Sequence, residues 1–246
     1  MSTEVKPKDN QTIPPWKVAL SVVATIVIVG LVMAAVLAAM TPGGQTVVQF
    51  LNWLFAANTV QIWWYVTRSA GIIAYLLLWF STILGLAVSS KYMDIMLDRL
   101  FTYDFHQFIS LLSVGFLLVH ILVLLIDRYL PYSVAQILIP FISPYRPVWV
   151  GIGVISFYVI LLVTITFYIK RQIGMRSFRI IHYLSLAGFL GGLLHGFFSG
   201  TDTALPSMRF VYYATGLSVL FFTVYWVILL AFRKMEKRKQ PVLTAK

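Results

Sequence analysis

The chain has 246 residues, of which 60 % are hydrophobic and only 11 % are charged, and its mean hydropathy is +0.87. A soluble globular domain carries about 25 % charged residues, so this composition excludes that class and indicates a polytopic membrane protein. The absence of cysteine excludes disulfides, thiolate-bound zinc, cysteine-ligated iron–sulfur clusters and covalently attached haem. The net charge of +11 is typical of Lys and Arg gathered in cytoplasmic loops, and we expect no nucleic-acid partner.

Six segments are long and apolar enough to cross a bilayer, which takes about 20 mainly apolar residues. They are residues 16–40, 63–89, 104–127, 147–169, 178–199 and 209–232. Each is too long for an outer-membrane barrel strand, which crosses in about 10 residues. The sequence therefore predicts an all-α fold, with a six-helix transmembrane domain over residues 16–232, a disordered tail at 1–15 and a basic tail at 233–246.

The first segment could also be a cleaved signal peptide, but its apolar run exceeds the usual 7–15 residues of a signal core, which favours a retained helix. Positive charges set the orientation. With the N-terminus inside, every one of the 19 Lys and Arg lies on the cytoplasmic side except Arg68, Arg128, Arg146 and Arg209. We therefore expect both termini to be cytoplasmic, in the cytoplasmic membrane of a bacterium or archaeon.

The connection over residues 128–147 is too apolar for a simple solvated loop, and its prolines prevent a spanning helix. We expect it to hold a short helix at the outer membrane interface. Its tyrosines would then lie at headgroup level; they are Tyr129, Tyr132 and Tyr145.

The chain has four histidines, and they form two matched pairs. His106 and His120 lie 14 positions apart in the third segment, or roughly 21 Å along a helix, and both point to roughly the same side. His182 and His195 lie 13 apart in the fifth segment, which runs in the same direction. The topology therefore puts His106 level with His182 (the inner pair) and His120 level with His195 (the outer pair).

Each pair could ligate a planar tetrapyrrole held between the two helices, and bis-imidazole ligation suits electron transfer because it leaves no open iron position. An intramembrane histidine can also simply hydrogen-bond a neighbouring helix. A metal-ion transport path is a further alternative, but it would need carboxylates among the imidazoles, and neither histidine stretch contains any.

One feature of the fifth segment conflicts with this arrangement. Thirteen residues of ideal helix rotate about 140° short of four turns, so His182 and His195 should not share a face. Three glycines lie between them, at positions 188, 191 and 192. Glycine allows a helix to bend or a partner to approach closely, so we expect a distorted or tilted fifth helix, while ordinary close packing would explain the glycines equally well.

The histidine spacing of 14 and 13 in helices two apart resembles the ferric reductase-like transmembrane domain. That family includes ferric reductases, NADPH oxidases and the haem subunit of the bacterial methionine sulfoxide reductase system. The stretch RSAGIIAYLLLWFSTILGLAVSS (68–90) is also similar to the opening helix of the domain. The resemblance covers residues 63–200. Respiratory cytochrome b subunits pair histidines as well, but they usually space them by 14 in both helices.

The resemblance implies two haem b groups, one ligated by His106 and His182 and the other by His120 and His195. Family members hold haem propionates with arginines near helix ends. Arg68 matches such a position at the outer end of the second segment, and an arginine within the membrane needs an anionic partner. Arg179, one turn before His182, could face the inner propionates, although it also fits a cytoplasmic charge at a helix start. Arg209 is a weaker outer candidate.

The departure from the family lies after the sixth segment. Full ferric reductases and NADPH oxidases continue into a flavin and nicotinamide domain, whereas only FRKMEKRKQPVLTAK follows here and no GxGxxG pattern is present. We therefore expect a separate electron donor, either a flavoprotein reductase or quinol. The acceptor outside would be ferric iron, oxygen or a redox protein. The chain could also anchor a separate oxidoreductase as its haem subunit, or be a transporter with structural histidines.

Overall fold

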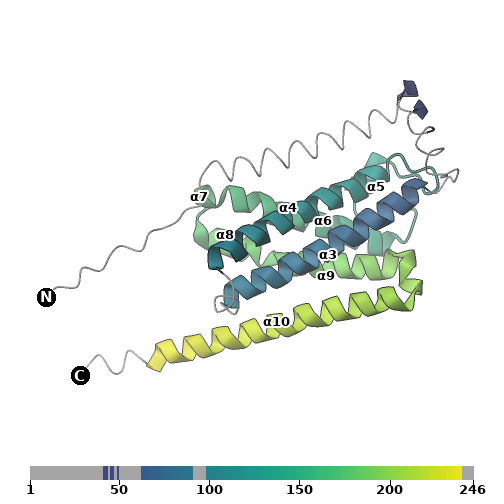
Figure 1. Ribbon diagram of the computed structural model, residues 1–246. Coiled ribbons are helices and arrows are strands. Elements are labelled where there is room, and N and C mark those ends of the chain that lie inside the picture. Colours follow the sequence, from purple (N-terminus) through teal and green to yellow (C-terminus); the bar gives the residue numbers. More distant parts are fainter. Residues whose placement is uncertain (1–40, 44, 47–48, 50–61, 91–97, 240–246) are drawn as a thin grey trace, which may run out of the picture.

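The protein is described here by a computed structural model, in which residues 41–43, 45–46, 49, 62–90 and 98–239 are placed (Figure 1). All regular elements in this part of the chain are helices. In order they are α3 (Ile62–Ser90), α4 (Arg99–Val123), α5 (Val134–Leu138), α6 (Pro147–Tyr168), α7 (Lys170–Ile173), α8 (Met175–His182), α9 (Leu184–Ser199), the 3-10 helix η2 (Thr201–Ala204) and α10 (Pro206–Lys239).

Five spans in the described residues are long and apolar enough to cross a membrane, which indicates an integral membrane protein. They are Ile62–Ser90, Leu100–Val123, Pro147–Tyr168, Met175–Ser199 and Pro206–Met235. They correspond to the second to sixth predicted segments. The first predicted segment, the N-terminal tail and residues 240–246 lie outside the described residues. The first segment as a further span, and the cytoplasmic position of both termini, therefore stay predictions.

Two predicted boundaries are wrong for identifiable reasons. The third segment begins at residue 99 rather than 104, because Asp98 caps the helix by accepting a hydrogen bond from the Leu100 backbone N–H at 2.7 Å. The sixth helix runs on to Lys239, well beyond its predicted end at residue 232. The first half of the expected basic tail is therefore helical, as its content of Lys, Arg, Glu and Met allows.

Helices α3 and α4 pack side by side as an antiparallel pair (Figure 1). Three backbone carbonyls of α3, evenly spaced along the helix, accept hydrogen bonds from side chains of α4. Thr67 O accepts from His120 Nδ1, Ala74 O from Ser113 Oγ, and Ser81 O from His106 Nδ1, at 2.8–2.9 Å. This repeat fixes the register of the two helices over the whole stretch between the two histidines.

Helices α6 and α9 form the second closely packed pair. Gly188 and Gly191 face Ile160 and Ser156 of α6, at distances where an added Cβ would be crowded. Small residues at such an interface let two helix backbones approach closely within a membrane. The glycines of the fifth segment therefore serve helix packing, which was one of the two predicted explanations.

The predicted distortion of the fifth segment is present, but it lies at Tyr183 rather than at the glycines. Helix α8 ends at His182 and α9 starts at Leu184, with Tyr183 between them. The Leu186 N–H bonds the Tyr183 carbonyl three residues back, at 3.2 Å, which is the tighter 3-10 pattern. The ligand candidates His182 and His195 thus belong to two different helices.

Helix α10 lies against α3 and α9, as Figure 1 shows. At this contact Tyr75, Phe189 and Tyr212 join Val219 in a buried cluster, and the hydroxyl of Tyr75 is hydrogen-bonded to that of Thr215. Much of the rest of α10 is exposed and apolar; the Phe210 side chain, for example, is 71 % exposed. Such a surface is suited to contact lipid.

The connection between α4 and α6 holds a short helix, as predicted. Helix α5 is fixed by a capping box between Ser133 and Gln136. The tyrosines of this connection do not all face outward. Tyr129 is exposed, whereas Tyr132 is buried and bonded to Ser143, and Tyr145 donates to the Ser199 carbonyl at 3.1 Å. Burial raises the pKa of Tyr132, so its phenol stays protonated.

Candidate functional site

The structure brings the four histidines together in the two pairs that the sequence predicts. The ring centres of His106 and His182 are 6.2 Å apart, with their planes at 81°. The ring centres of His120 and His195 are also 6.2 Å apart, with their planes at 73°. Helix α4 supplies one histidine of each pair, while the partners come from α8 and α9.

Three of the four imidazoles are oriented by a backbone carbonyl. His106 Nδ1 lies 2.9 Å from Ser81 O, His120 Nδ1 lies 2.8 Å from Thr67 O, and His195 Nδ1 lies 3.0 Å from Trp149 O. A carbonyl only accepts hydrogen bonds, so Nδ1 carries the proton and Nε2 holds a free lone pair. A ligating histidine usually donates its second ring nitrogen to such a carbonyl.

A glycine stands one turn after each of these carbonyls. An added Cβ on Gly71 would lie 2.8 Å from His120 Nδ1, and one on Gly153 would lie 2.5 Å from His195 Nδ1. The Cβ of a substituted Gly85 would lie 3.2 Å from His106 Cε1. Each of these three imidazoles therefore lies directly against a helix backbone; a Cβ at position 71 or 153 would collide with it, and one at position 85 would crowd it.

Sequence reasoning missed these glycines, although the sequence contains a signal for two of them. Gly71 and Gly85 have the same spacing on α3 as His106 and His120 have on α4. In an antiparallel pair of helices, equal spacings can place one glycine opposite each histidine, here Gly71 opposite His120 and Gly85 opposite His106. The signal for Gly153 is only that it stands in the helix preceding the fifth segment.

His106 is held by a second group besides the carbonyl. Its Nδ1 lies 3.2 Å from Ser81 Oγ, and this hydroxyl is 2.6 Å from Ser110 Oγ. Ser110 in turn donates to the His106 carbonyl at 2.7 Å. The two hydroxyls therefore satisfy each other inside the membrane and limit rotation of the His106 ring.

Each histidine pair faces a cavity. The outer pair lines a cavity of about 200 Å³, and the inner pair lines one of about 100 Å³. The walls of the outer cavity include polar groups from several elements; among them are Arg68, Gln136, Tyr145, Ser199, Thr201 and Asp202. The walls of the inner cavity include Ser81, Gly85, Ser110, Tyr183, Ser185 and Trp226.

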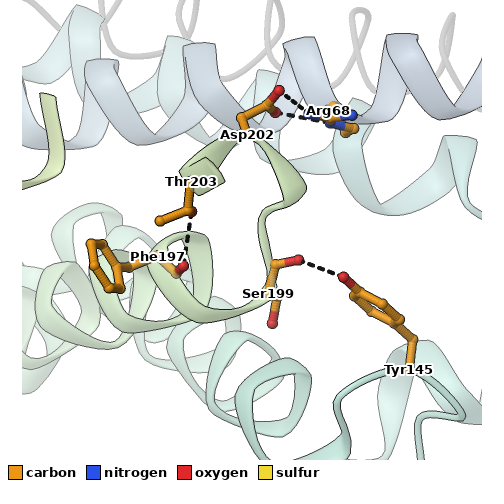
Figure 2. A network of polar contacts seen from close by, with 6 residues as sticks. All are labelled: Arg68, Tyr145, Phe197, Ser199, Asp202 and Thr203. Carbon is orange, nitrogen blue, oxygen red and sulfur yellow. Dashed lines mark hydrogen bonds and ion pairs between the residues drawn. The ribbon is translucent and has the colours of Figure 1, made fainter. Parts of the chain in front are cut away.

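Arg68 forms an ion pair with Asp202 of η2, as Figure 2 shows. The Nε atom of Arg68 donates to Asp202 Oδ2 at 2.8 Å, and the two side chains are only 23 % and 24 % exposed. The chain itself therefore supplies the anionic partner that an intramembrane arginine needs. Sequence reasoning did not identify Asp202, because it lies in the connection after the fifth segment.

The connection from α9 to α10 is tied down at further points near this ion pair (Figure 2). Thr203 donates to the Phe197 carbonyl at 2.8 Å, and Tyr145 donates to the Ser199 carbonyl at 3.1 Å. Arg209 donates from Nε to the Thr203 carbonyl at 2.7 Å. Arg209 thus braces the η2 connection from the exposed side and is absent from the residues that line the outer cavity.

Arg179 does not reach the inner cavity. Its side chain is exposed, and its Nε donates to the Met175 carbonyl one turn earlier at 3.3 Å. It is absent from the residues that line the inner pair. In this structure Arg179 therefore stands as a surface charge of α8, the second explanation that the sequence left open for it.

The described residues contain no group of three or more His, Asp, Glu or Cys that could hold a bare metal ion. The histidines occur strictly as pairs, and no carboxylate completes either of them. Comparison of the chain with models of protein families, with curated proteins and with solved structures found no match.

Proposed function

We propose that this chain is a di-haem b-type membrane cytochrome that carries electrons across the bilayer, similar to the transmembrane component of ferric reductases. The observation that carries the proposal is the equal separation of the two imidazole pairs. Both pairs have ring centres 6.2 Å apart, although they are formed by different helices and lie about four turns apart along α4.

This separation fits two imidazoles bound to one metal. A ring nitrogen lies about 1.1 Å from the ring centre and a metal–imidazole bond is about 2.0 Å long, so two rings in line across one metal have centres about 6.2 Å apart. The aromatic contact between Phe167 and Phe178 has the same separation, so the distance supports ligation only together with the pairing of all four histidines and their free Nε2 atoms. No hydrogen bond among the described residues occupies the Nε2 atom of any of the four, so these atoms are free to ligate.

The donor set favours haem over a bare ion. Structural zinc takes four protein ligands and catalytic zinc takes three, whereas each site here offers two imidazoles and no carboxylate among the described residues. A tetrapyrrole would bring its own ring nitrogens to the iron, so the two imidazoles of one pair would complete its ligand set. The apolar walls of both cavities suit the faces of such a macrocycle.

The roles of this chain's residues follow from the contacts. His106 and His182 would hold the inner haem, and His120 and His195 the outer one, through Nε2. The carbonyls of Thr67, Ser81 and Trp149 fix the ring orientation and raise the basicity of the ligands. Arg68 lines the outer cavity with its pair partner Asp202, and its guanidinium has five N–H donors, so it can serve both Asp202 and a haem propionate.

A haem held by two of these imidazoles would supply one-electron chemistry. The chain keeps the inner and outer sites roughly 21 Å apart along α4, so an electron that passes between them crosses most of the bilayer core. Each electron that crosses is worth about 2.3 kcal/mol per 100 mV of membrane potential. A flavoprotein or quinol would supply electrons on the cytoplasmic side, and ferric iron, oxygen or a redox protein would accept them outside.

The decisive experiment is an absorption spectrum of the detergent-purified protein, oxidised and then reduced with dithionite, with haem counted as the pyridine haemochrome. We expect a b-type spectrum and two haems per chain. His106→Ala and His120→Ala should each remove one haem. Gln107→Ala is the matched control, because Gln107 neighbours His106 on α4 but lines neither cavity.

The opposite outcome is equally clear. A folded preparation, produced with an ample supply of haem, that contains none would refute the cytochrome proposal. The histidines would then be structural, and a transporter would become the better hypothesis.

A further inference from the structure

The four proposed haem ligands are not held alike. His106, His120 and His195 each have Nδ1 within 3.0 Å of a backbone carbonyl. The Nδ1 atom of His182 is buried and has no hydrogen-bond partner. A buried polar atom without a partner is rare in proteins, and here it belongs to one member of an otherwise regular set.

The cause lies in α6. His195 lies on the α6 backbone because Gly153 leaves room beside the Trp149 carbonyl. The corresponding place for His182 lies about four turns after Gly153 along α6, near Phe167. Helix α6 contains no glycine beyond Gly153. A side chain with a Cβ at that place keeps an imidazole away from the helix backbone.

Aromatic packing takes the place of the missing hydrogen bond. Phe178 lies one turn before His182, with ring centres 5.2 Å apart, and it also contacts Phe167 at 6.2 Å. These contacts support the His182 ring from one side, but they do not fix which nitrogen carries the proton. A free imidazole has two tautomers, and only the one with the proton on Nδ1 offers Nε2 to a metal.

We propose that the inner haem site is the weaker of the two, because His182 is the one ligand that no backbone carbonyl orients. The proposal rests on the function proposed above. Groups that hydrogen-bond a metal ligand typically contribute about 10- to 100-fold in metal affinity. In the outer site both ligands have such a group, whereas in the inner site only His106 has one and His182 has none.

The direct test compares two single-site proteins. The double variant H120A/H195A keeps only the inner site, and H106A/H182A keeps only the outer site. Each is prepared without haem in detergent and titrated with haemin, with the bound form followed by its absorption band. We expect the inner-site protein to bind about 10- to 100-fold more weakly. Equal affinities, or a tighter inner site, would overturn the inference, whereas no binding at either site would refute the proposed function itself.

A second variant tests the physical cause in the outer-site protein. Gly153→Ala places a Cβ 2.5 Å from His195 Nδ1, which must displace the ring from the Trp149 carbonyl. We expect the haemin affinity of this site to fall toward that of the inner site. The reduction potential should rise as well, because an imidazole that loses this hydrogen bond is a weaker donor to ferric iron.

The matched control is Gly115→Ala on α4, where an added Cβ meets no atom within 4 Å. It should leave both affinity and potential unchanged. If Gly153→Ala changes neither quantity, the carbonyl contact does not set the strength of the site, and the inference is wrong even where the two sites differ.

Discussion

Replacing Gly71 with alanine should weaken the outer haem site much more than the equivalent change at Gly85 weakens the inner site. Both glycines lie on α3 beneath an imidazole of α4. A Cβ at position 71 would lie 2.8 Å from His120 Nδ1, well inside the 3.4 Å at which ordinary contact begins. A Cβ at position 85 would lie 3.2 Å from His106 Cε1 and 3.7 Å from its Nδ1, so that ring needs to shift only slightly.

The two substitutions separate haem binding from stability. Gly→Ala in a helix interior favours the helix by about 0.8–1.0 kcal/mol. In Gly71→Ala the His120 ring must move away from the Thr67 carbonyl, which leaves its buried Nδ1–H without a partner at a cost of about 1–3 kcal/mol. The helix preference offsets part of this cost, so the free energy of unfolding of the haem-free protein should fall by no more than about 2 kcal/mol, while the haemin affinity of the outer site falls about 10-fold or more.

Haemin titration of the two single-site proteins measures these affinities, and thermal unfolding of the haem-free forms measures stability. Gly85→Ala should reduce the affinity of the inner site by no more than a few-fold, and its unfolding midpoint should rise slightly. If Gly71→Ala and Gly85→Ala weaken their sites equally, or if Gly71→Ala leaves the outer site intact, the glycines do not seat the imidazoles.

Three further predictions concern other parts of the site. The imidazole planes of both pairs are nearly perpendicular, so the ferric protein should give highly anisotropic low-spin electron paramagnetic resonance signals; the signals of parallel imidazoles would contradict this geometry. Asp202→Asn leaves the half-buried Arg68 without its counter-ion and should lower the unfolding midpoint of the haem-free protein. Asp202→Glu should restore part of the loss, and an unchanged midpoint in Asp202→Asn would show that the ion pair does not stabilise the fold. Tyr75→Phe removes the buried hydroxyl contact between α3 and α10. It should lower the free energy of unfolding by only about 1 kcal/mol, because Thr215 keeps its bond to the Val211 carbonyl; a loss several times larger would contradict this.

The sequence was sufficient to predict the pairing of the histidines. Spacing along each helix gave the level of each ring, and the alternation of spans gave the direction of each helix. Apart from the third, the described spans also begin within a few residues of their predicted starts, because apolar length is the signal that a bilayer imposes. These predictions needed no knowledge of side-chain contacts.

The residues around the histidines could not be predicted in this way. Asp202 lies in a connection, and nothing in its neighbourhood marks it as the partner of an arginine 134 residues earlier. Tyr132 and Tyr145 resemble interfacial residues by composition, yet their rings turn inward to line the outer cavity. Tertiary packing decides both cases, and hydropathy carries no information about it.

The spacing of 14 between the histidines of α4 can be understood from the register of α3 and α4. Carbonyls of α3 at residues 67, 74 and 81 accept side chains of α4 at every seventh position. Seven residues fall only about 20° short of two full turns. Two histidines 14 apart on α4 therefore both face α3, and each donates from Nδ1 to a carbonyl of that helix.

A spacing of 13 cannot work in this way on a continuous helix, because it would turn His182 about 140° away from the face of His195. The fifth span departs from a continuous α-helix at Tyr183, where a 3-10 hydrogen bond tightens the turn. The ring centre of His182, just before that turn, lies 6.2 Å from that of His106. His195 meets α6 at Gly153, beside the Trp149 carbonyl, whereas the stretch of α6 toward His182 contains no glycine. The inner pair is therefore completed by a ligand that no carbonyl orients, and its Nδ1 atom has no hydrogen-bond partner.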